Sequence, residues 1–276
     1  MIMLKYWRLN WTLQQIFTIR NYRKHNQILH SSWKYWLTLI LKFFPSIYKS
    51  PICLKLKEGG SFIVKDFMTL YIYNEIFVEK SYDYPHLKAD QPVIIDIGAN
   101  TGLFSLRMKQ LYPESNLYSY EPFLKNFEQL EQNINLSKLR NIEIFQKGIG
   151  GRTRTEKLFL NKNNLGGHSL YEMEARNSEF VEIEIIGIAD LLSNLGLDRI
   201  HLIKMDCEGA EYEIIKGIDS RLASQIEIIL FESTESVYDI NDVTDHLKAL
   251  GFEIEFIEKS CNYVARNLNF STCEIT

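Results

Sequence analysis

The sequence predicts an α/β protein in which helices cover both faces of a mostly parallel sheet. From Val93 onward, short apolar runs alternate with stretches of helical periodicity, the rhythm of parallel strands joined by helices. The apolar run Val93–Ile97 passes directly into a loop of small residues, as the first strand of such a sheet often does. With 276 residues, 46% of them hydrophobic, the chain can form a sizeable core in one large or two small domains.

The predicted elements follow one another closely along the chain. Strands are predicted at residues 93–97, 117–120, 142–146, 200–205, 226–231, 252–258 and 263–265. Helices are predicted at residues 102–111, 123–135, from about 210, and 242–250. The short turn at Lys259 and Ser260 makes the last two strands antiparallel.

Two segments stand outside this alternation. Residues 52–56 and 62–64 alternate around Gly59 and Gly60 and predict a hairpin, after which Asp66 is placed to cap a helix over 67–78. Residues 157–160 and 181–186 predict two strands around a polar loop that contains His168. We therefore expect residues 152–186 to form an insertion at the functional edge of the sheet.

Charge divides the chain into two parts. Ten Lys or Arg precede the first acidic residue, Glu58, whereas the remainder holds 21 basic and 35 acidic residues. All four tryptophans also lie in the early, basic part. We therefore expect a basic, aromatic-rich helical extension over residues 1–50 and one domain over residues 51–276. Within that domain, we expect residues 51–90 to form the hairpin and helix, and residues 91–276 to form the α/β core.

Three interpretations of the extension remain open. Its most apolar run, residues 36–41, is far shorter than the roughly 20 residues that span a membrane. A helix lying in a membrane interface is favoured by apolar residues at helical spacing beside lysines: Trp33, Trp36, Leu37 and Ile40, with Lys34 and Lys42. The alternatives are a helix packed on the acidic body and a nucleic-acid-binding segment. The acidic charge of the body argues against nucleic acid, and we expect none.

The four cysteines are scattered and form no CxxC pair: Cys53, Cys207, Cys261 and Cys273. This argues against a zinc ribbon or a disulfide scaffold and favours a reducing compartment. We therefore expect a cytoplasmic protein, with any membrane contact at the inner face of the membrane.

The loop after the first predicted strand indicates a cofactor site. Gly98 and Gly102 allow the backbone to turn sharply and to approach a ligand closely, while Asp96 can hold the loop by accepting hydrogen bonds. The next strand ends at Glu121, whose carboxylate can accept hydrogen bonds from two ribose hydroxyls. Loop and acid together predict an adenosine site.

The loop sequence distinguishes between adenosine cofactors. A dinucleotide site requires G-x-G-x-x-G, but residues 98–102 are Gly-Ala-Asn-Thr-Gly. This G-x-N-x-G form resembles motif I of the class I S-adenosylmethionine-dependent methyltransferases, whose cofactor carries no phosphates. An NAD-dependent oxidoreductase remains an alternative, because Glu121 would also hold an NAD ribose.

A second motif narrows the family. Residues 203–211 read Ile-Lys-Met-Asp-Cys-Glu-Gly-Ala-Glu, a buried strand that ends in an acid and leads into a helix. Together with Asp-Ile-Gly-Ala-Asn-Thr-Gly at residues 96–102, this stretch resembles the FkbM family of methyltransferases over about residues 55–265. The resemblance implies a Rossmann-like sheet of seven strands with an antiparallel last strand. It also implies an S-adenosylmethionine site at Asp96, Gly98, Ala99, Asn100, Thr101, Gly102, Glu121, Pro122, Gly148 and Asp206.

The catalytic candidates follow from the chemistry of O-methylation. A hydroxyl group is a poor nucleophile, so a carboxylate, a histidine or a metal ion must help to remove its proton. Asp206, Glu208 and the loop residue His168 are the expected catalytic side chains. A divalent cation bound by Asp206 and Glu232 is an alternative that the sequence leaves open, whereas Glu211 fits a structural role at a helix start.

These residues favour an S-adenosylmethionine-dependent O-methyltransferase. The expected acceptor is a hydroxyl group of a saccharide, a glycolipid or another natural product. A non-catalytic scaffold on a methyltransferase fold is the alternative from another class. The basic extension would hold such an enzyme near a membrane where glycans are assembled, and the sequence leaves the oligomeric state open.

Overall fold

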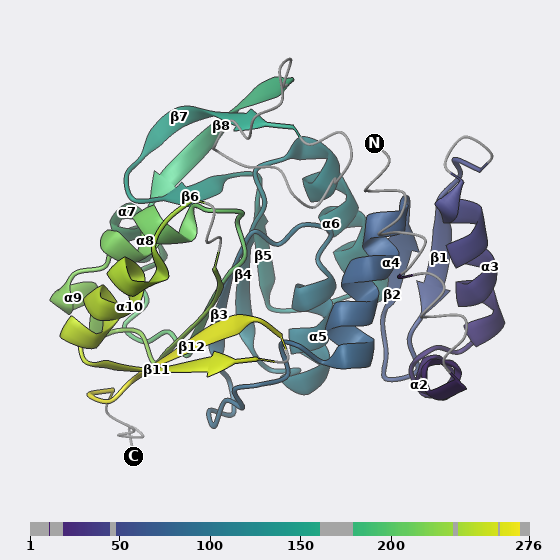
Figure 1. The fold of residues 1–276 in the computed structure, drawn as a ribbon, viewed down its shortest axis with the longest axis horizontal. Helices are drawn as coiled ribbons and strands as arrows, with labels where there is room; N and C mark the ends of the chain where they lie inside the picture. The colour runs from purple at the N-terminus through teal and green to yellow at the C-terminus, as the bar shows by residue number, and fades with distance from the viewer. Residues whose placement is uncertain are drawn as a thin grey trace.

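A seven-stranded sheet forms the centre of the chain in the computed structural model, which describes residues 11, 19–44, 48–160, 179–233, 237–258 and 260–270 (Figure 1). Its strand order is β11-β12-β10-β9-β3-β4-β5. The strands are β3 (Val93–Ile97), β4 (Asn116–Tyr120), β5 (Ile142–Phe145), β9 (Leu202–Met205), β10 (Ile228–Glu232), β11 (Phe252–Ile257) and β12 (Asn262–Asn267).

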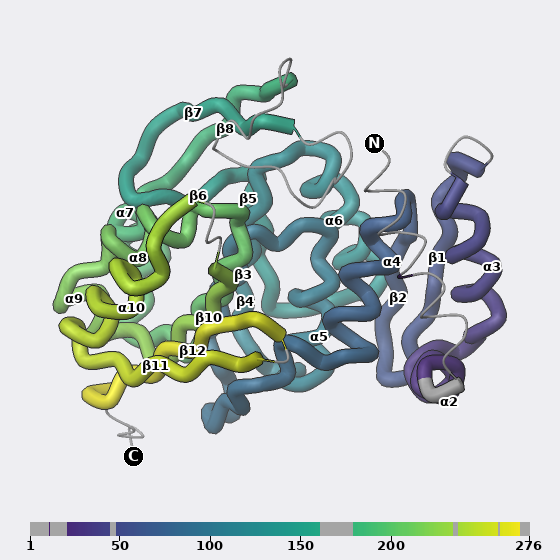
Figure 2. The backbone as a smooth tube through the Cα atoms, in the orientation of Figure 1, coloured from purple at the N-terminus to yellow at the C-terminus, as the bar shows by residue number. Residues whose placement is uncertain are grey.

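Pairing in this sheet is parallel except around β12. The central strand β3 pairs in parallel with β4 and β9, and β12 is antiparallel to both β10 and β11. Figure 2 shows the chain turning back from β11 into β12 to complete this edge. The predicted fold class, including the antiparallel last strand, is confirmed.

The alternation of side chains along β3 creates two cores, one on each face of the sheet. Ile94 belongs to one buried cluster, whereas Ile95 and Ile97 belong to the other. The first face is covered by α4 (Phe67–Tyr73), η1 (Asn74–Glu79) and α5 (Leu103–Leu111). The opposite face is covered by α7 (Ile188–Leu195), α8 (Glu211–Lys216), α9 (Ser220–Ala223) and α10 (Ile240–Ala249). The helix α6 (Leu124–Ser137) packs beside α5 and against the N-terminal hairpin.

The hairpin and its following helix form as the sequence predicts. Strands β1 (Ile52–Lys55) and β2 (Ser61–Val64) pair antiparallel, and the Asp66 side chain accepts a hydrogen bond from the Thr69 N–H at 2.9 Å. After α4 the helix widens into the π-helical turn η1, a feature that periodicity alone does not reveal.

The N-terminal helices α2 (Ile19–Ile28) and α3 (Ser32–Phe43) lie at one end of the molecule, beside the hairpin (Figure 1). Tyr35 and Leu39 of α3 are fully buried in the same cluster as Leu54 and Leu56 of the hairpin region. The described part of the extension therefore packs on the body, as one of the three interpretations expected.

The interfacial-helix pattern needs a correction at two residues. Trp36 packs in an aromatic cluster with His25 and Tyr35, and Lys42 is buried and donates to the Ser50 carbonyl at 2.7 Å. They turn inward because one side of α3 must cover the core. The other three apolar residues of the pattern, Trp33, Leu37 and Ile40, are exposed, and so is Phe44 directly after the helix. Among the described residues, no helix has the length and hydropathy needed to cross a membrane.

The insertion predicted at residues 152–186 contributes to a separate small sheet. Its strands are β6 (Gly148–Gly150), β7 (Arg154–Phe159) and β8 (Phe180–Gly187), in the order β6-β8-β7 (Figure 1). The strand β6 lies directly after β5 and pairs in parallel with β8, which the sequence did not predict. Residues 161–178 lie outside the described part of the chain.

Two leucines of α3 test whether the extension is part of the folded body. Leu39 is fully buried, whereas Leu37 on the same helix is 45% exposed. We expect Leu39→Ala to lower the free energy of unfolding by about 2–5 kcal/mol, because it leaves a cavity, and Leu37→Ala to change it by less than about 0.5 kcal/mol. Urea unfolding of both variants measures the difference. Equal, small effects would show that α3 does not belong to the cooperative core.

Candidate functional site

The loop between β3 and α5 has an unusual backbone path. Gly98 and Asn100 have φ values of 77° and 50°, and the N–H groups of Gly98 and Ala99 both donate to the Tyr120 carbonyl, at 3.0 and 2.9 Å. A Cβ atom at Gly98 would lie 2.0 Å from the Asp206 carbonyl oxygen. Only glycine therefore lets the loop lie against the end of β9 while it remains tied to the end of β4.

Glu121 follows β4 and lies across from this loop. Its carboxylate accepts hydrogen bonds from the Asn100 and Phe123 N–H groups, both at 2.9 Å, and the residue is 5% exposed. Burial raises the pKa of Glu121 to about 7, although the two hydrogen bonds act in the opposite direction. Each carboxylate oxygen has a second lone pair, so the group can still accept hydrogen bonds from a ligand.

Loop and acid border a cavity at the carboxyl ends of the strands, the edge where ligands bind in such sheets. The ends of β3, β4 and β9 and the start of β6 contribute to its lining. Six of the ten predicted cofactor residues line it: Gly98, Asn100, Glu121, Pro122, Gly148 and Asp206. The candidate catalytic residue Glu208 lines it as well.

The other four predicted cofactor residues do not line this cavity. Asp96 is fully buried beneath the loop, so any effect it has on a cofactor must pass through its neighbours. Ala99 lines a second cavity on the other side of the loop. Thr101 and Gly102 lead into α5, and the Thr101 carbonyl accepts a hydrogen bond from Asn133 Nδ2 at 2.8 Å.

The small sheet supplies an apolar wall to the first cavity. Leu158 of β7 and Ile183 and Ile185 of β8 line it opposite the loop. The expected insertion therefore contributes to the lining through these three residues. Its predicted loop and the catalytic candidate His168 lie outside the described residues.

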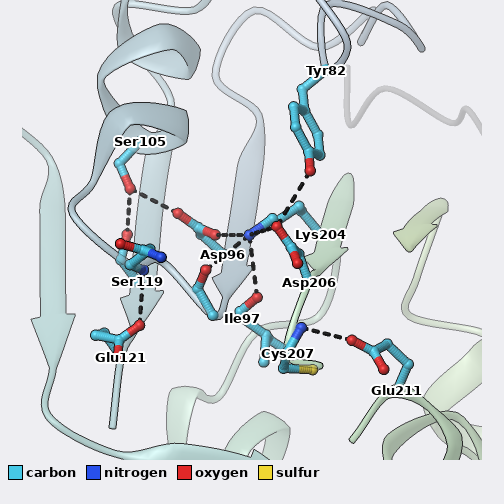
Figure 3. A network of polar contacts seen from close by, with 12 residues as sticks. Tyr82, Asp96, Ile97, Ser105, Ser119, Glu121, Lys204, Asp206, Cys207 and Glu211 are labelled. Atoms are coloured by element: carbon cyan, nitrogen blue, oxygen red, sulfur yellow. Dashed lines mark hydrogen bonds and ion pairs between the residues drawn. The ribbon is translucent and has the colours of Figure 1, made fainter. Parts of the chain in front are cut away.

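Lys204 connects the two sequence motifs (Figure 3). Asp96 lies directly opposite Lys204 in the parallel register of β3 and β9, and the Lys204 Nζ lies 3.2 Å from Asp96 Oδ1 and 3.7 Å from Asp206 Oδ2. The same ammonium group donates to the Gly98 carbonyl at 2.9 Å. Burial opposes its charge, but the carboxylates of Asp96 and Asp206 outweigh that effect and raise the pKa of Lys204.

Further hydrogen bonds fix both carboxylates around Lys204. Ser105 Oγ donates to Asp96 Oδ2 at 2.9 Å, and the Tyr82 hydroxyl donates to Asp206 Oδ2 at 3.3 Å (Figure 3). Asp206 nevertheless keeps 35% of its side chain exposed and lines both cavities. It is therefore both oriented by the protein and accessible to a ligand.

The turn after β9 explains why one of its acids is structural. Glu211 is buried, and its two carboxylate oxygens accept from the Cys207 N–H at 2.6 Å and the Gly209 N–H at 2.8 Å. These bonds close the turn in which Glu208 has a φ of 54°. The structural interpretation of Glu211 is confirmed, whereas Glu208 lies at the cavity.

Three further acids crowd the same edge of the sheet. Burial first, and then the charge of Asp206, raise the pKa of Glu208 and of Glu75 to about 7. Partial desolvation at the end of β10, together with Asp206 and Glu75, raises the pKa of Glu232 to about 8. Such groups can exchange protons near neutral pH.

The structure gives no support to the metal alternative. Within the described ranges, no group of three or more His, Cys, Asp or Glu side chains is arranged to hold a metal ion. In the part of the chain that the structure describes, Asp206 and Glu232 are not grouped with the further ligands that such a centre needs.

Sequence reasoning missed Glu75 and Tyr82 and left the role of Lys204 undecided. For Lys204 a signal was present, since a lysine two residues before Asp206 in a buried strand needs a counter-charge. The register that places Asp96 opposite it depends on which strands are neighbours. Glu75 and Tyr82 precede the sheet by many residues, and nothing in their spacing connects them to either motif.

The sheet, the glycine-containing loop and the acid one strand away define an α/β protein with a cavity at the carboxyl ends of its strands, where such sheets bind ligands. The family model described as the methyltransferase FkbM domain matches residues 96–263, more than half of the chain. The chain belongs to this family and is a methyltransferase, as the two motifs predicted.

Three curated relatives agree with that assignment. Methyltransferase sdnD of Sordaria araneosa is 30% identical over 214 residues, which cover 67% of this chain and 82% of the relative. Methyltransferase 1 of Beauveria bassiana is 27% identical over 202 residues, covering 67% of this chain and 81% of the relative. The 2-O-methyltransferase NoeI of Sinorhizobium fredii is 27% identical over 169 residues, covering 55% of this chain and 68% of the relative.

The buried acid Glu121 should make the stability of the protein depend on pH. Its pKa is raised from 4.5 to about 7 on folding, so the folded state binds its proton more tightly than the unfolded chain. The contribution of such a group to the free energy of unfolding therefore falls as pH rises from about 5 to 8. We expect wild-type protein to lose stability relative to Glu121→Gln over this range.

Urea unfolding of both proteins at several pH values measures that difference. Burial lowers the pKa of His25 to about 3, so the contribution of His25 to the free energy of unfolding rises with pH up to about 6.5. This contribution is present in both proteins and cancels in the comparison. A constant difference between wild type and Glu121→Gln from pH 5 to 8 would contradict the raised pKa.

Proposed function

We propose that the protein transfers a methyl group from S-adenosylmethionine to a hydroxyl oxygen of a saccharide, a glycolipid or another natural product. The observation that carries this proposal is the cavity that extends from Glu121 past the Gly98 loop to Asp206. At Glu121 the cavity offers a carboxylate that suits a ribose, and near Asp206 it offers a group of acids that suits a cationic methyl donor.

The charges around the site favour this donor over a dinucleotide. Among the described residues that line the two cavities, Lys204 is the only Lys or Arg, and it is already paired with Asp96. A pyrophosphate would meet Asp206, Glu208 and Glu121 without a positive partner, which is costly in a partly buried site. S-adenosylmethionine brings a sulfonium and an ammonium group instead, so the residues present fit it.

The name of one relative supports oxygen as the acceptor atom. The relative from Sinorhizobium fredii is named a 2-O-methyltransferase. We extend methyl transfer to an oxygen atom to this chain, and we do not extend the substrate of that relative. The sugar part of the proposal rests on the acidic, hydrogen-bonding edge formed by Asp206, Glu208 and Glu232, which suits a polyhydroxylated acceptor.

The residues of the chain can perform the steps that methyl transfer requires. When bound, the cofactor supplies an activated methyl group. Asp206 is held by Tyr82 and Lys204, so it can orient an acceptor hydroxyl at the cavity, and the reacting atoms must be held within about 3 Å. Glu208 and Glu232 have pKa values of about 7 and 8, which suit a general base at neutral pH.

Transfer of a labelled methyl group to a panel of glycans, lipids and small metabolites tests this function. We expect wild-type protein to label at least one hydroxyl-bearing acceptor. Asp206→Asn should reduce the rate by about 10²-fold, because it removes the charge that orients the acceptor hydroxyl. Glu184→Gln, at an exposed position on β8, serves as the matched control and should leave the rate unchanged. Full activity of Asp206→Asn would contradict the catalytic assignment.

The proposed enzyme also binds an anionic membrane surface through α3. Trp33, Leu37, Ile40 and Phe44 form a stripe of side chains that are 45–65% exposed. The segment around them carries ten basic residues before the first acid, and basic residues near an anionic leaflet each contribute about 1 kcal/mol. Tryptophan favours the headgroup level of a bilayer, so the positive charge and the aromatic composition of this segment both favour an anionic membrane.

Sedimentation with lipid vesicles tests the membrane contact. We expect binding to vesicles that contain phosphatidylglycerol and little binding to phosphatidylcholine alone. Trp33→Ala combined with Ile40→Ala should weaken binding by about tenfold, since less apolar area is buried. The control Phe256→Ala removes an exposed aromatic residue from β11 and should change nothing. Equal lack of binding to both vesicle types would overturn this part of the proposal.

A further inference from the structure

A second cavity lies on the other side of the Gly98 loop from the first. It shares Gly98, Asn100 and Asp206 with the first cavity. Its remaining walls include Tyr82 and Glu75, which come from the segment before the sheet. Because the two cavities meet at the loop and at Asp206, one extended ligand can occupy both.

Glu75 reaches this cavity through the π-helical turn η1. The neighbouring side chains Ile76, Phe77 and Val78 are buried in the core, and Asn74 Nδ2 donates to Glu79 Oε1 at 2.6 Å. π-Helical turns are frequent at functional sites because they change the direction in which single side chains project. The turn here leaves Glu75 at the cavity while the rest of the segment is anchored.

The second cavity has more negative than positive charge. Glu75 and Asp206 both line it, and Lys204 is its only basic residue among the described part of the chain. The Lys204 ammonium lies closer to Asp96 (3.2 Å) than to Asp206 (3.7 Å), so most of its charge is balanced beneath the loop. The charge of Asp206, after burial, is the main influence that raises the pKa of Glu75.

The carbonyl oxygens on this side of the loop already face a cation. Those of Ile97 and Gly98 both accept from Lys204 Nζ, at 3.5 and 2.9 Å. A ligand ammonium group beside these carbonyls would be repelled by Lys204, so carboxylates farther from it are better partners. Glu75 and Asp206 are the carboxylates at hand, and Tyr82 and Phe104 form an aromatic wall beside them.

We propose that Glu75 binds the α-ammonium group of the methyl donor in the second cavity. The inference rests on the proposed function, since it assigns the amino-acid end of the same cofactor whose nucleoside end lies at Glu121. It makes Glu75 a cofactor-binding residue supplied by the segment before the sheet. It also explains why an acid occupies this position in a segment that otherwise packs in the core.

Isothermal titration calorimetry at pH 7.5 with two cofactor fragments tests the inference. S-Adenosylhomocysteine carries the ammonium group, whereas 5′-methylthioadenosine lacks the amino-acid end. We expect Glu75→Gln to weaken binding of S-adenosylhomocysteine by about tenfold and to change binding of 5′-methylthioadenosine by less than about twofold. Glu184→Gln, the same change at an exposed position on β8 that lines neither cavity, should leave both affinities unchanged.

The other outcomes separate an error about Glu75 from an error about the cofactor. If Glu75→Gln binds both compounds like wild type, or loses affinity for both equally, Glu75 does not recognise the ammonium group. If wild-type protein binds neither compound, the proposed cofactor is wrong and the inference falls with it. Thermal unfolding of Glu75→Gln, which should match that of wild type or exceed it, shows that the variant is folded.

Discussion

The architecture of the site depends on one buried ion pair between neighbouring central strands. Burying a charge is costly unless it is paired, and removing one partner of a buried pair typically costs several kcal/mol. Asp96 and Lys204 satisfy that requirement because the register of β3 and β9 places them opposite each other on the same face. From this position the Lys204 ammonium also reaches the Gly98 carbonyl and the Asp206 carboxylate. Lys204 therefore links the loop that borders the first cavity to the Asp206 carboxylate.

A second constraint shapes the end of the cavity at Glu121. The loop is pressed so closely against the end of β9 that Gly98 cannot carry a Cβ atom, and its Asn100 N–H donates to Glu121. Glu121 thus belongs to the scaffold of the loop as well as to the cavity. The remaining acids, Asp206, Glu208 and Glu232, continue along the same edge. The lining of the cavity therefore combines apolar side chains, among them Leu158 and Ile185, with the acids Glu121, Asp206 and Glu208.

Much of this arrangement could be predicted from the sequence, because the signals are local. The strand Val93–Ile97, the loop and Glu121 follow one another within 30 residues, and their spacing alone indicates a nucleoside site. Contacts between distant segments could not be predicted. Trp36 and Lys42 turned inward because α3 covers a hydrophobic core that the pattern of the helix does not reveal. Glu75 reached the site through a π-helical turn, for which the sequence has no recognisable signature.

A crystal structure of the protein soaked with S-adenosylhomocysteine tests the central claim most directly. The account predicts that the ribose hydroxyls lie within hydrogen-bonding distance of the Glu121 carboxylate, with the amino-acid end passing the Gly98 loop toward Asp206. A nucleoside bound elsewhere, while the space beside Glu121 stays closed by protein atoms, would contradict it.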